Sequence, residues 1–343
     1  MSDRAHVDRG PGCRSWEDAE QLEKLLQEHP EDMTARQELV VWYHKKEHET
    51  ARAREARYRH ILWLIEHRPD SELAGSPFVV MFKDVDVAAI PEAKRLWLEQ
   101  TVAHPHDAKI LGNAANFFLN AAKDDWSTTC DLLRQAEALD PENADWPEQL
   151  AQLHETRARR LRGEERKAAS FQALACYERA YEANKSVRKE SHLVERLAVN
   201  ALQAEEFEKA REYASRLLGG VLQARKPVDT WNYSNAVHWG NVVLGRVALR
   251  QGDLDAAKHH LLEAGNTPGS PQLSSQGPDM VLARELLAAG ETGAAAGYFK
   301  ACSTFWEPGK DRLMHWAAAI EEGRPPNFDF RPAPAIRESE RGV

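Results

Sequence analysis

The chain has 343 residues, and its 54 acidic and 45 basic side chains give a formal net charge of −9. That charge argues against a general nucleic-acid-binding protein. The length exceeds what one compact core usually supports, so we expect a repeat architecture in which each unit packs on its neighbours. We find no apolar leader and no run of 18 apolar residues, so we expect neither a secretion signal nor a membrane span.

Composition indicates the fold class. Ala, Leu, Glu, Gln and Arg dominate, and alternating Val, Ile and Thr are almost absent, which predicts an all-α protein. The four cysteines, Cys13, Cys130, Cys176 and Cys302, lie far apart in the sequence. We interpret them as reduced packing residues of a cytoplasmic protein rather than as a disulfide framework.

The N-terminal part begins with a polar tail over residues 1–14, followed by helices predicted at 15–28 and 33–47. The next helical segment, ARAREARYRHILWLIEHRP, has a charged front half that we expect to face solvent. Residues 74–90 fit the helical pattern poorly. Within them, Phe78 to Phe82 is compatible with a short extended run or a buried connection.

Four prolines mark a regular spacing in this weaker half of the chain. They are separated by 39, 36 and 36 residues, and an acid follows each within two residues: Pro30, Pro69, Pro105 and Pro141. Proline just past one helix and an acid at the start of the next are typical helix boundaries. The spacing therefore predicts that helical hairpins begin near residue 15.

The pattern is clearer after residue 106. We predict helices over 146–162, then from a break at Gly163 to about 184, and over 191–203, 205–225, 279–289, 292–305 and 310–322. Polar segments at 227–235 and 265–278 are predicted to be loops, and the Pro-rich tail from Arg324 to be extended.

Residues 236–265 give the strongest hairpin signal. Gly252 suits the left-handed end of one helix, and Asp253 suits the N-cap of the next. Small residues follow at separations of 12 and 7 in this hairpin, and the same separations recur in the next: Gly245, Ala257, Ala264, then Ala283, Ala295, Cys302. Small residues there allow close helix packing, and their recurrence indicates a helical repeat.

The segments GRVALRQGDLDAAKHHLLEA and ARELLAAGETGAAAGYFKAC resemble tetratricopeptide repeats, most clearly over residues 106–305. The frame distances of 38 to 47 residues exceed the 34 of that family. The resemblance implies a right-handed superhelix of about seven antiparallel helical hairpins over 15–322. It would be divergent over 15–105, capped by a helix at 310–322, and followed by the tail 323–343.

In that family the first helices line a concave groove that binds proteins or peptides. Carried over, the groove residues here are Asn113, Asn116, Asn120, Trp231, Tyr233, Asn235, His238, Trp239, Arg246, Met280 and Arg284. The three early asparagines share one helix face, where amides can bind a peptide backbone. The alternative is that these amides bond neighbouring helices or loops, and that the residues around Tyr233 only pack.

The sequence contains only weak matches to catalytic or metal-binding motifs. The segment from His44 to His48 matches H-x-x-E-H, a zinc-protease pattern, but residues 114–124 hold no Glu for the third ligand. We therefore interpret it as a solvated helix end, and the pairs His259–His260 and His104–His106 as surface or packing residues. Phosphate-loop and nucleophile-elbow motifs are missing. We assign no catalytic residue, metal or cofactor.

Two basic runs, at 52–59 and 157–162, are interleaved with or followed by acids, which favours solvated faces over phosphate or RNA sites. The leading functional prediction is a non-enzymatic, cytoplasmic scaffold that binds a protein or peptide, with Trp239, Arg246, Arg284 and the asparagines as principal contacts. One alternative is an accessory or regulatory subunit of a protein-modifying enzyme. Another is an RNA-binding regulator that uses the stretch from Arg157 to Lys167.

Overall fold

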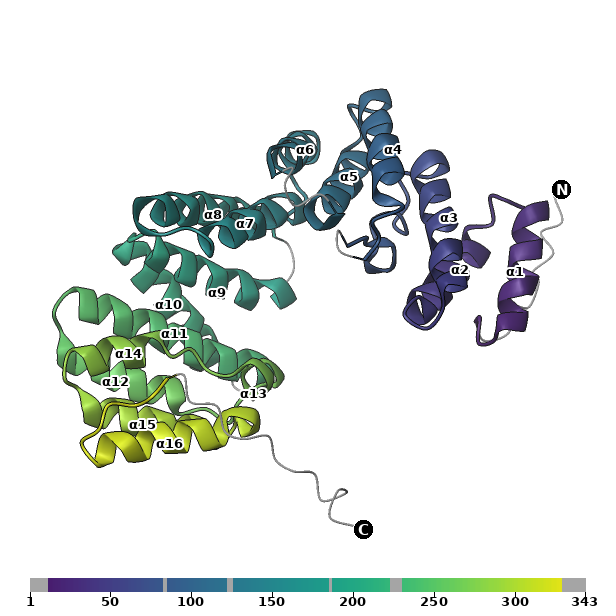
Figure 1. The fold of residues 1–343 in the computed structure, drawn as a ribbon. Helices are drawn as coiled ribbons and strands as arrows, with labels where there is room; N and C mark the ends of the chain where they lie inside the picture. Colours follow the sequence, from purple (N-terminus) through teal and green to yellow (C-terminus); the bar gives the residue numbers. More distant parts are fainter. Residues whose placement is uncertain (1–11, 83–84, 122–125, 185–186, 223–229, 329–343) are drawn as a thin grey trace, which may run out of the picture. The chain divides into compact units, whose positions relative to one another are not determined.

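A computed structural model describes residues 12–82, 85–121, 126–184, 187–222 and 230–328. These residues form sixteen α-helices and two short 3-10 helices, and they contain no strand (Figure 1). The chain divides into two compact units, residues 1–150 and 151–343, with the division inside helix α7 (Asp145–Ala158). The predicted all-α class is confirmed.

Six helices precede α7 in the N-terminal unit. They are α1 (Trp16–Glu28), α2 (Met33–Lys46), α3 (Ala51–His67), α4 (Ile90–Ala103), α5 (Ala108–Ala121) and α6 (Trp126–Leu139). Each packs against the next one along the chain, from α1 on α2 through α5 on α6. This order of contacts is what a stack of helical hairpins requires.

The boundaries of these helices follow local chemistry. Ser15 forms a capping box with Asp18 at the start of α1, and the side chains of Asp32 and Thr50 cap α2 and α3. Each of the four spaced prolines lies two residues beyond the end of a helix, namely α1, α3, α4 or α6. The proposed role of these prolines as helix punctuation is confirmed.

The poorly fitting segment after α3 is a buried connection. It contains one 3-10 turn, η1 (Pro77–Val79), and the side chains of Val79 and Met81 are buried. Apolar side chains further along it, Phe82, Val85 and Val87, are exposed. Of the two alternatives for this segment, the connection is the one observed, and residues 83–84 lie outside the described part.

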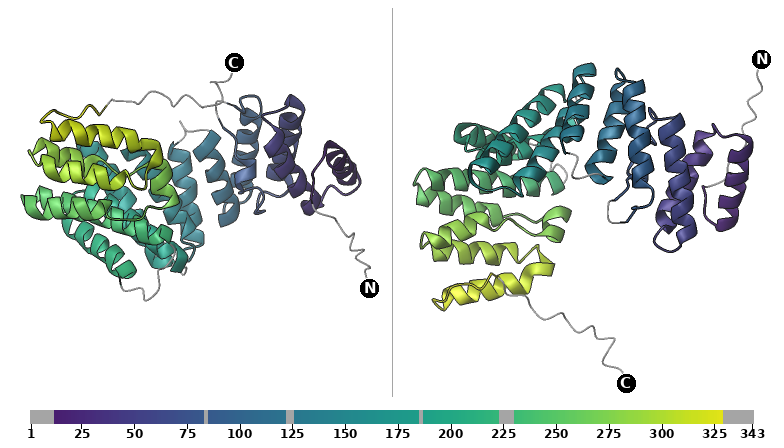
Figure 2. Two further views of the ribbon diagram at one scale, coloured as in Figure 1. Left: turned by 90° about the horizontal axis from the view of Figure 1, so that it is seen from below. Right: turned by 45° about the horizontal axis from the view of Figure 1, so that its top comes forward.

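The C-terminal unit continues the pairing. Its helices are α8 (Gly163–Ala183), α9 (Val187–Gln203), α10 (Phe207–Leu222), α11 (Thr230–Arg250), α12 (Leu254–Gly265), α13 (Pro271–Gln276), α14 (Val281–Ala288), α15 (Thr292–Cys302) and α16 (Lys310–Glu321), with η2 (Glu307–Gly309) before the last. Neighbours pack from α8 through α12, and then α12 on α15 and α15 on α16. Both views of Figure 2 show the last two, in yellow, side by side.

Two predicted loops are partly helical. Helix α11 begins at Thr230, so the loop predicted over 227–235 is wrong from that residue onward. Packing overrides the loop-like composition here, because Ser234 and Asn235 are buried. The short helix α13 interrupts the loop predicted over 265–278, since the Ser270 side chain caps its first turn and Pro271 occupies its first position.

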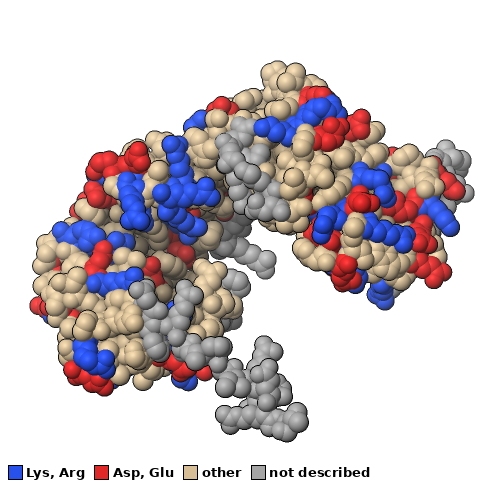
Figure 3. All heavy atoms as spheres, viewed as in Figure 1, with Lys and Arg blue, Asp and Glu red and all other residues tan. Residues whose placement is uncertain are grey.

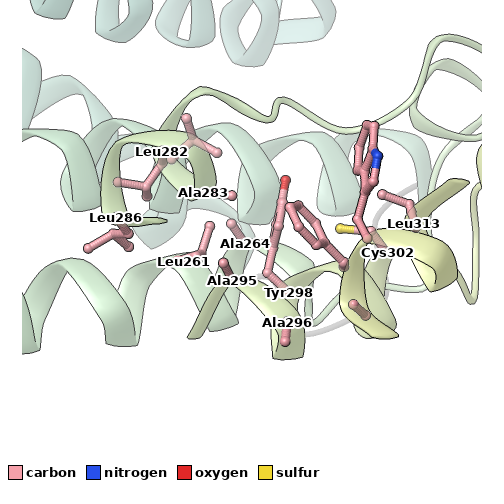
Figure 4. Packing of buried hydrophobic residues seen from close by; sticks show 14 of the residues in the cluster. Leu261, Ala264, Leu282, Ala283, Leu286, Ala295, Ala296, Tyr298, Cys302 and Leu313 are labelled. Atoms are coloured by element: carbon pink, nitrogen blue, oxygen red, sulfur yellow. The ribbon is translucent and has the colours of Figure 1, made fainter. Parts of the chain in front are cut away.

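The core of this unit lies between α12, α14, α15 and α16 (Figure 4). Leu261, Leu282 and Leu286 are completely buried there together with Tyr298 and Phe299. The small residues have the expected effect. A Cβ atom added to Gly245 would lie 2.5 Å from Cδ2 of Leu282, so α11 approaches this core as closely as a bare backbone allows.

The hairpin turn predicted at 251–253 is confirmed. Gly252 has φ of +81°, in the left-handed region, and Asp253 Oδ1 accepts a 3.0 Å hydrogen bond from the backbone N–H of Ala256. The predicted break at Gly163 is also present, with φ of +53°.

Candidate functional site

The asparagine row lies on α5 of the N-terminal unit. The Asn113 amide donates to the backbone carbonyls of Pro69 at 2.8 Å and Ser71 at 3.1 Å. Asn116 donates to the carbonyl of Gly75 at 3.2 Å. These amides hold the connection after α3 in place, which is the internal role left open by the sequence. Asn120 donates to its own helix, to the carbonyl of Asn116 at 2.9 Å.

Two residues of this row also border a cavity. Asn113 and Asn116 line it together with apolar side chains of α3, α4, α5 and the connection, among them Ile61, Trp97 and Phe117. Its volume is about 20 Å³, room for a single water molecule. Occupation by a larger ligand would require the lining to move.

A buried ion cluster also holds this connection. The Arg57 guanidinium, 1% exposed, donates to the Glu47 carboxylate at 2.8 Å and to the carbonyls of Phe78 and Val80 at 3.0 and 2.6 Å. Asp86 accepts hydrogen bonds from the Tyr58 hydroxyl at 2.7 Å and from the backbone N–H of Phe82 at 2.6 Å.

This cluster corrects the expectation for Arg57 and gives a structural role to the glutamate of the H-x-x-E-H segment. Arg57 was predicted to lie on a solvated face, but it is buried because its helical position points at Glu47 and the connection. Its neighbours Arg52 and Arg59 are exposed and paired with Glu20 and Glu23. In the H-x-x-E-H segment, the acid is therefore the partner of a buried arginine. No group of three potential metal ligands occurs among the described residues.

A second buried ionisable cluster joins α7, α8 and α9. The carboxylate of Glu155 is paired with Arg196 and accepts hydrogen bonds from Asn200 Nδ2 at 3.0 Å and the Tyr177 hydroxyl at 3.3 Å. Glu195 lies next to it, and burial raises the pKa of its carboxyl to about 7. Sequence analysis missed this cluster, because its members come from three helices and share no local pattern.

The residues predicted around the start of α11 form an internal network. Asn235 donates to Gln272 Oε1 at 2.9 Å and accepts from the Ser270 hydroxyl at 2.7 Å. His238 is completely buried. Its Nδ1 lies 3.0 Å from the Ala264 carbonyl, and its Nε2 accepts from the backbone N–H of Asp279 at 3.1 Å. Burial lowers the pKa of His238, so its imidazole stays neutral in the folded unit.

Two further predicted residues of α11, Tyr233 and Trp239, are partly buried. Tyr233 is half-buried, and the side chain of Trp231 lies outside the described residues. The Trp239 ring packs against Val194, Leu217 and Ala236, with its centroid 5.3 Å from that of His238. Asn235, His238 and Trp239 thus lie together on α11, and the contacts observed there are those of packing.

The two predicted groove arginines have different environments. Arg246 forms a bidentate pair with Glu285, at 2.9 and 3.0 Å, and Arg250 donates to the same carboxylate at 2.7 Å. Met280 is partly buried against the core. Arg284 instead lies over the aromatic ring of Phe328, with the guanidinium carbon 4.2 Å from the ring centroid.

Phe328 ends a segment without helix or strand, residues 324–328, which we call the strap. After α16 the chain turns back, and the strap runs across the last helices (Figure 1). The Trp316 indole N–H donates to the Asn327 carbonyl at 2.6 Å. The Phe328 ring centroid lies 4.9 Å from that of Trp316 and 6.4 Å from that of Phe299. The tail was predicted to be extended; its described part has no regular structure over 324–327 and a turn at 328, and its docking was not predicted.

The surface is mixed in charge. Lys and Arg lie next to Asp and Glu over much of the face seen in Figure 3. In the basic run after α7, the Arg159 guanidinium lies 3.8 Å from the Glu155 carboxylate, and Arg160 and Arg162 are exposed.

A scan against models of known protein families finds no match for this chain, and a search among curated proteins finds no relative. In the part of the chain that the structure describes, no helix combines the length and apolar character needed to cross a membrane.

Proposed function

We propose that the protein is a non-enzymatic scaffold that binds a segment of another protein on the helices of its C-terminal unit. The observation that carries this proposal is the docked strap. The Asn327 carbonyl accepts a hydrogen bond from the Trp316 indole, and the Phe328 ring lies against Arg284, Phe299 and Trp316. A surface that binds a segment of its own chain through a backbone carbonyl and an aromatic ring has the chemistry to bind a similar segment from a partner.

The architecture supports the same proposal. Helices that pack on their sequence neighbours leave a row of faces available to a ligand, which is how helical repeats bind other chains. We propose that these pairs belong to a right-handed superhelix of tetratricopeptide type. Cys130, Cys176 and Cys302 are buried and are not joined in disulfides, which supports a reducing, cytoplasmic location.

The test is selection of peptides from a random displayed library on the full-length protein, followed by photo-cross-linking of the enriched peptides. We expect peptides that cross-link to α14, α15 or α16. Failure of any peptide to enrich above a bait-free control would contradict the proposal.

A parallel affinity capture from lysate of the source cell separates the scaffold from the accessory-subunit alternative. Wild type is compared with Arg284→Glu, after both are shown to have the same circular dichroism spectrum. Stable copurification with a catalytic chain, equal for both proteins, would favour the alternative.

A further inference from the structure

The surface that holds Phe328 is built by three helices. Arg284 comes from α14, Phe299 from α15 and Trp316 from α16, and we call these three residues the seat. Because α15 packs against both α14 and α16, the seat draws one side chain from each of three adjoining helices. Phe299 is completely buried and Trp316 nearly so, which fixes two walls of the seat in the core.

The seat recognises two chemical features of its occupant, an aromatic ring and a backbone carbonyl. An aromatic ring meets the Trp316 and Phe299 rings edge-on, in the favourable T-shaped arrangement, and receives the Arg284 cation on its face. The carbonyl of the preceding residue accepts the Trp316 N–H. The ring and the carbonyl belong to adjacent residues of one short stretch of chain, so the seat selects a peptide segment that carries phenylalanine.

The strap has the features of a replaceable occupant. It follows α16 after a short turn, and residues 324, 325 and 327 are exposed, whereas Phe328 is half-buried. Its attachment to the same chain gives it a high effective concentration at the seat, on the millimolar scale for a short tether. A partner segment must therefore compete with it.

We propose that the seat is the docking site for a phenylalanine in a partner segment, and that Phe328 occupies the seat until such a segment displaces it. This inference rests on the proposed scaffold function and adds to it the chemistry of the ligand and an intramolecular competitor. In the partner's segment the phenylalanine takes the place of Phe328, and the carbonyl of the residue before it takes the place of the Asn327 carbonyl.

The test uses a fluorescent, C-terminally amidated peptide with the sequence of residues 322–328, EGRPPNF, and full-length proteins. Binding is measured by fluorescence anisotropy to wild type, to Phe328→Ala and to the double variant Phe328→Ala/Arg284→Ala. Phe171→Ala is the matched control, because Phe171 is an exposed phenylalanine of the same unit on α8. Circular dichroism and thermal melts establish that all four proteins are folded.

We expect the peptide to bind Phe328→Ala at least ten-fold more tightly than wild type or Phe171→Ala, because the tethered competitor is gone. A peptide ending in Ala instead of Phe, and the double variant, should each reduce that binding at least ten-fold. Equal binding to wild type and Phe328→Ala, or equal binding of the Ala peptide, would overturn the inference.

Two further outcomes separate this inference from the scaffold proposal. If library peptides bind Phe328→Ala but the strap peptide does not compete with them, the scaffold proposal stands and the seat is wrong. If wild type forms a dimer in sedimentation that Phe328→Ala does not form, the occupant is the strap of a second copy, and the intramolecular competitor is overturned.

Discussion

The guanidinium of Arg57 and the carboxylate of Glu47 are 2.8 Å apart, and both side chains are almost completely shielded from water. Asp86 lies near the same guanidinium, at 3.9 Å. The charge of Arg57 therefore balances buried carboxylates, while its other N–H groups satisfy the carbonyls of Phe78 and Val80. Arg57 thus anchors the chain between α3 and α4 at two backbone carbonyls.

We expect Arg57→Leu to lower the free energy of unfolding of the N-terminal unit by about 3–5 kcal/mol, because the carboxylates stay buried without their cation. Arg59→Leu is the control, since Arg59 is 66% exposed and its pair with Glu23 should contribute about 0–1 kcal/mol. Urea unfolding followed by far-UV circular dichroism measures both. Equal effects of the two substitutions would show that the buried cluster is not stabilising.

Asn113 is the second anchor of this connection. Replacing it with Ala removes both hydrogen bonds to the Pro69 and Ser71 carbonyls and should lower the free energy of unfolding by about 1–3 kcal/mol. Asn120→Ala should change it by less than about 1 kcal/mol, because Asn120 bonds within its own helix. Thermal unfolding distinguishes the two. A reversed order would show that Asn113 does not anchor the connection.

Gly245 tests the close approach of α11 to the core. A Cβ atom there would meet Cδ2 of Leu282 at 2.5 Å and Cβ of His260 at 3.1 Å, so Gly245→Ala should be destabilising by about 1–3 kcal/mol. Gly293→Ala provides the opposite case. Nothing lies within 4 Å of a Cβ atom at this helical position, so the substitution should stabilise by up to about 1 kcal/mol. Denaturant midpoints of the two variants should move in opposite directions from wild type.

Glu195 gives a pH dependence. Burial raises the pKa of its carboxyl from 4.5 to about 7 in the folded unit, so the folded state binds more protons than the unfolded state between those values. Its contribution to stability is therefore present at low pH and is lost as the pH rises through 7. We expect Glu195→Gln to be more stable than wild type at pH 8, by about 1–3 kcal/mol, because it removes a buried charge.

The measurement is urea unfolding of wild type and Glu195→Gln at pH 5 and pH 8, and the difference between them should be several-fold smaller at pH 5. The exposed Glu208→Gln on α10 is the control, with an expected effect below about 0.5 kcal/mol at either pH. A difference of the same size at both pH values would show that the ionisation of Glu195 is not its cause.

Local features were predictable from the sequence, and contacts between distant residues were not. Gly252, Asp253 and the four spaced prolines act on backbone within a few residues, so their pattern was sufficient to position helix ends. The shared face of Asn113 and Asn116 was also predictable, but not the carbonyls that they bind, more than 40 residues earlier.

The same limit applies to the candidate sites. Arg246 and Arg284 were predicted as equivalent groove residues, yet Glu285 pairs with one and Phe328 covers the other. Which residue meets an arginine depends on how α14 and the strap pack, and periodicity within a helix carries no such information. The pair of Glu155 and Arg196 was missed for the same reason, because α7 and α9 are not consecutive in the sequence and their contact depends on tertiary packing.

The order of the seat and the strap along the chain has a consequence for biosynthesis. The ribosome releases α14, α15 and α16 before residues 324–328, and these helices pack on one another locally, so they are able to fold early. Trp316 precedes Phe328 by only 12 residues, so the last wall of the seat and its occupant leave the ribosome almost together, after the walls from α14 and α15. On the proposal above, a partner segment therefore meets the strap as a competitor from the moment the seat is complete.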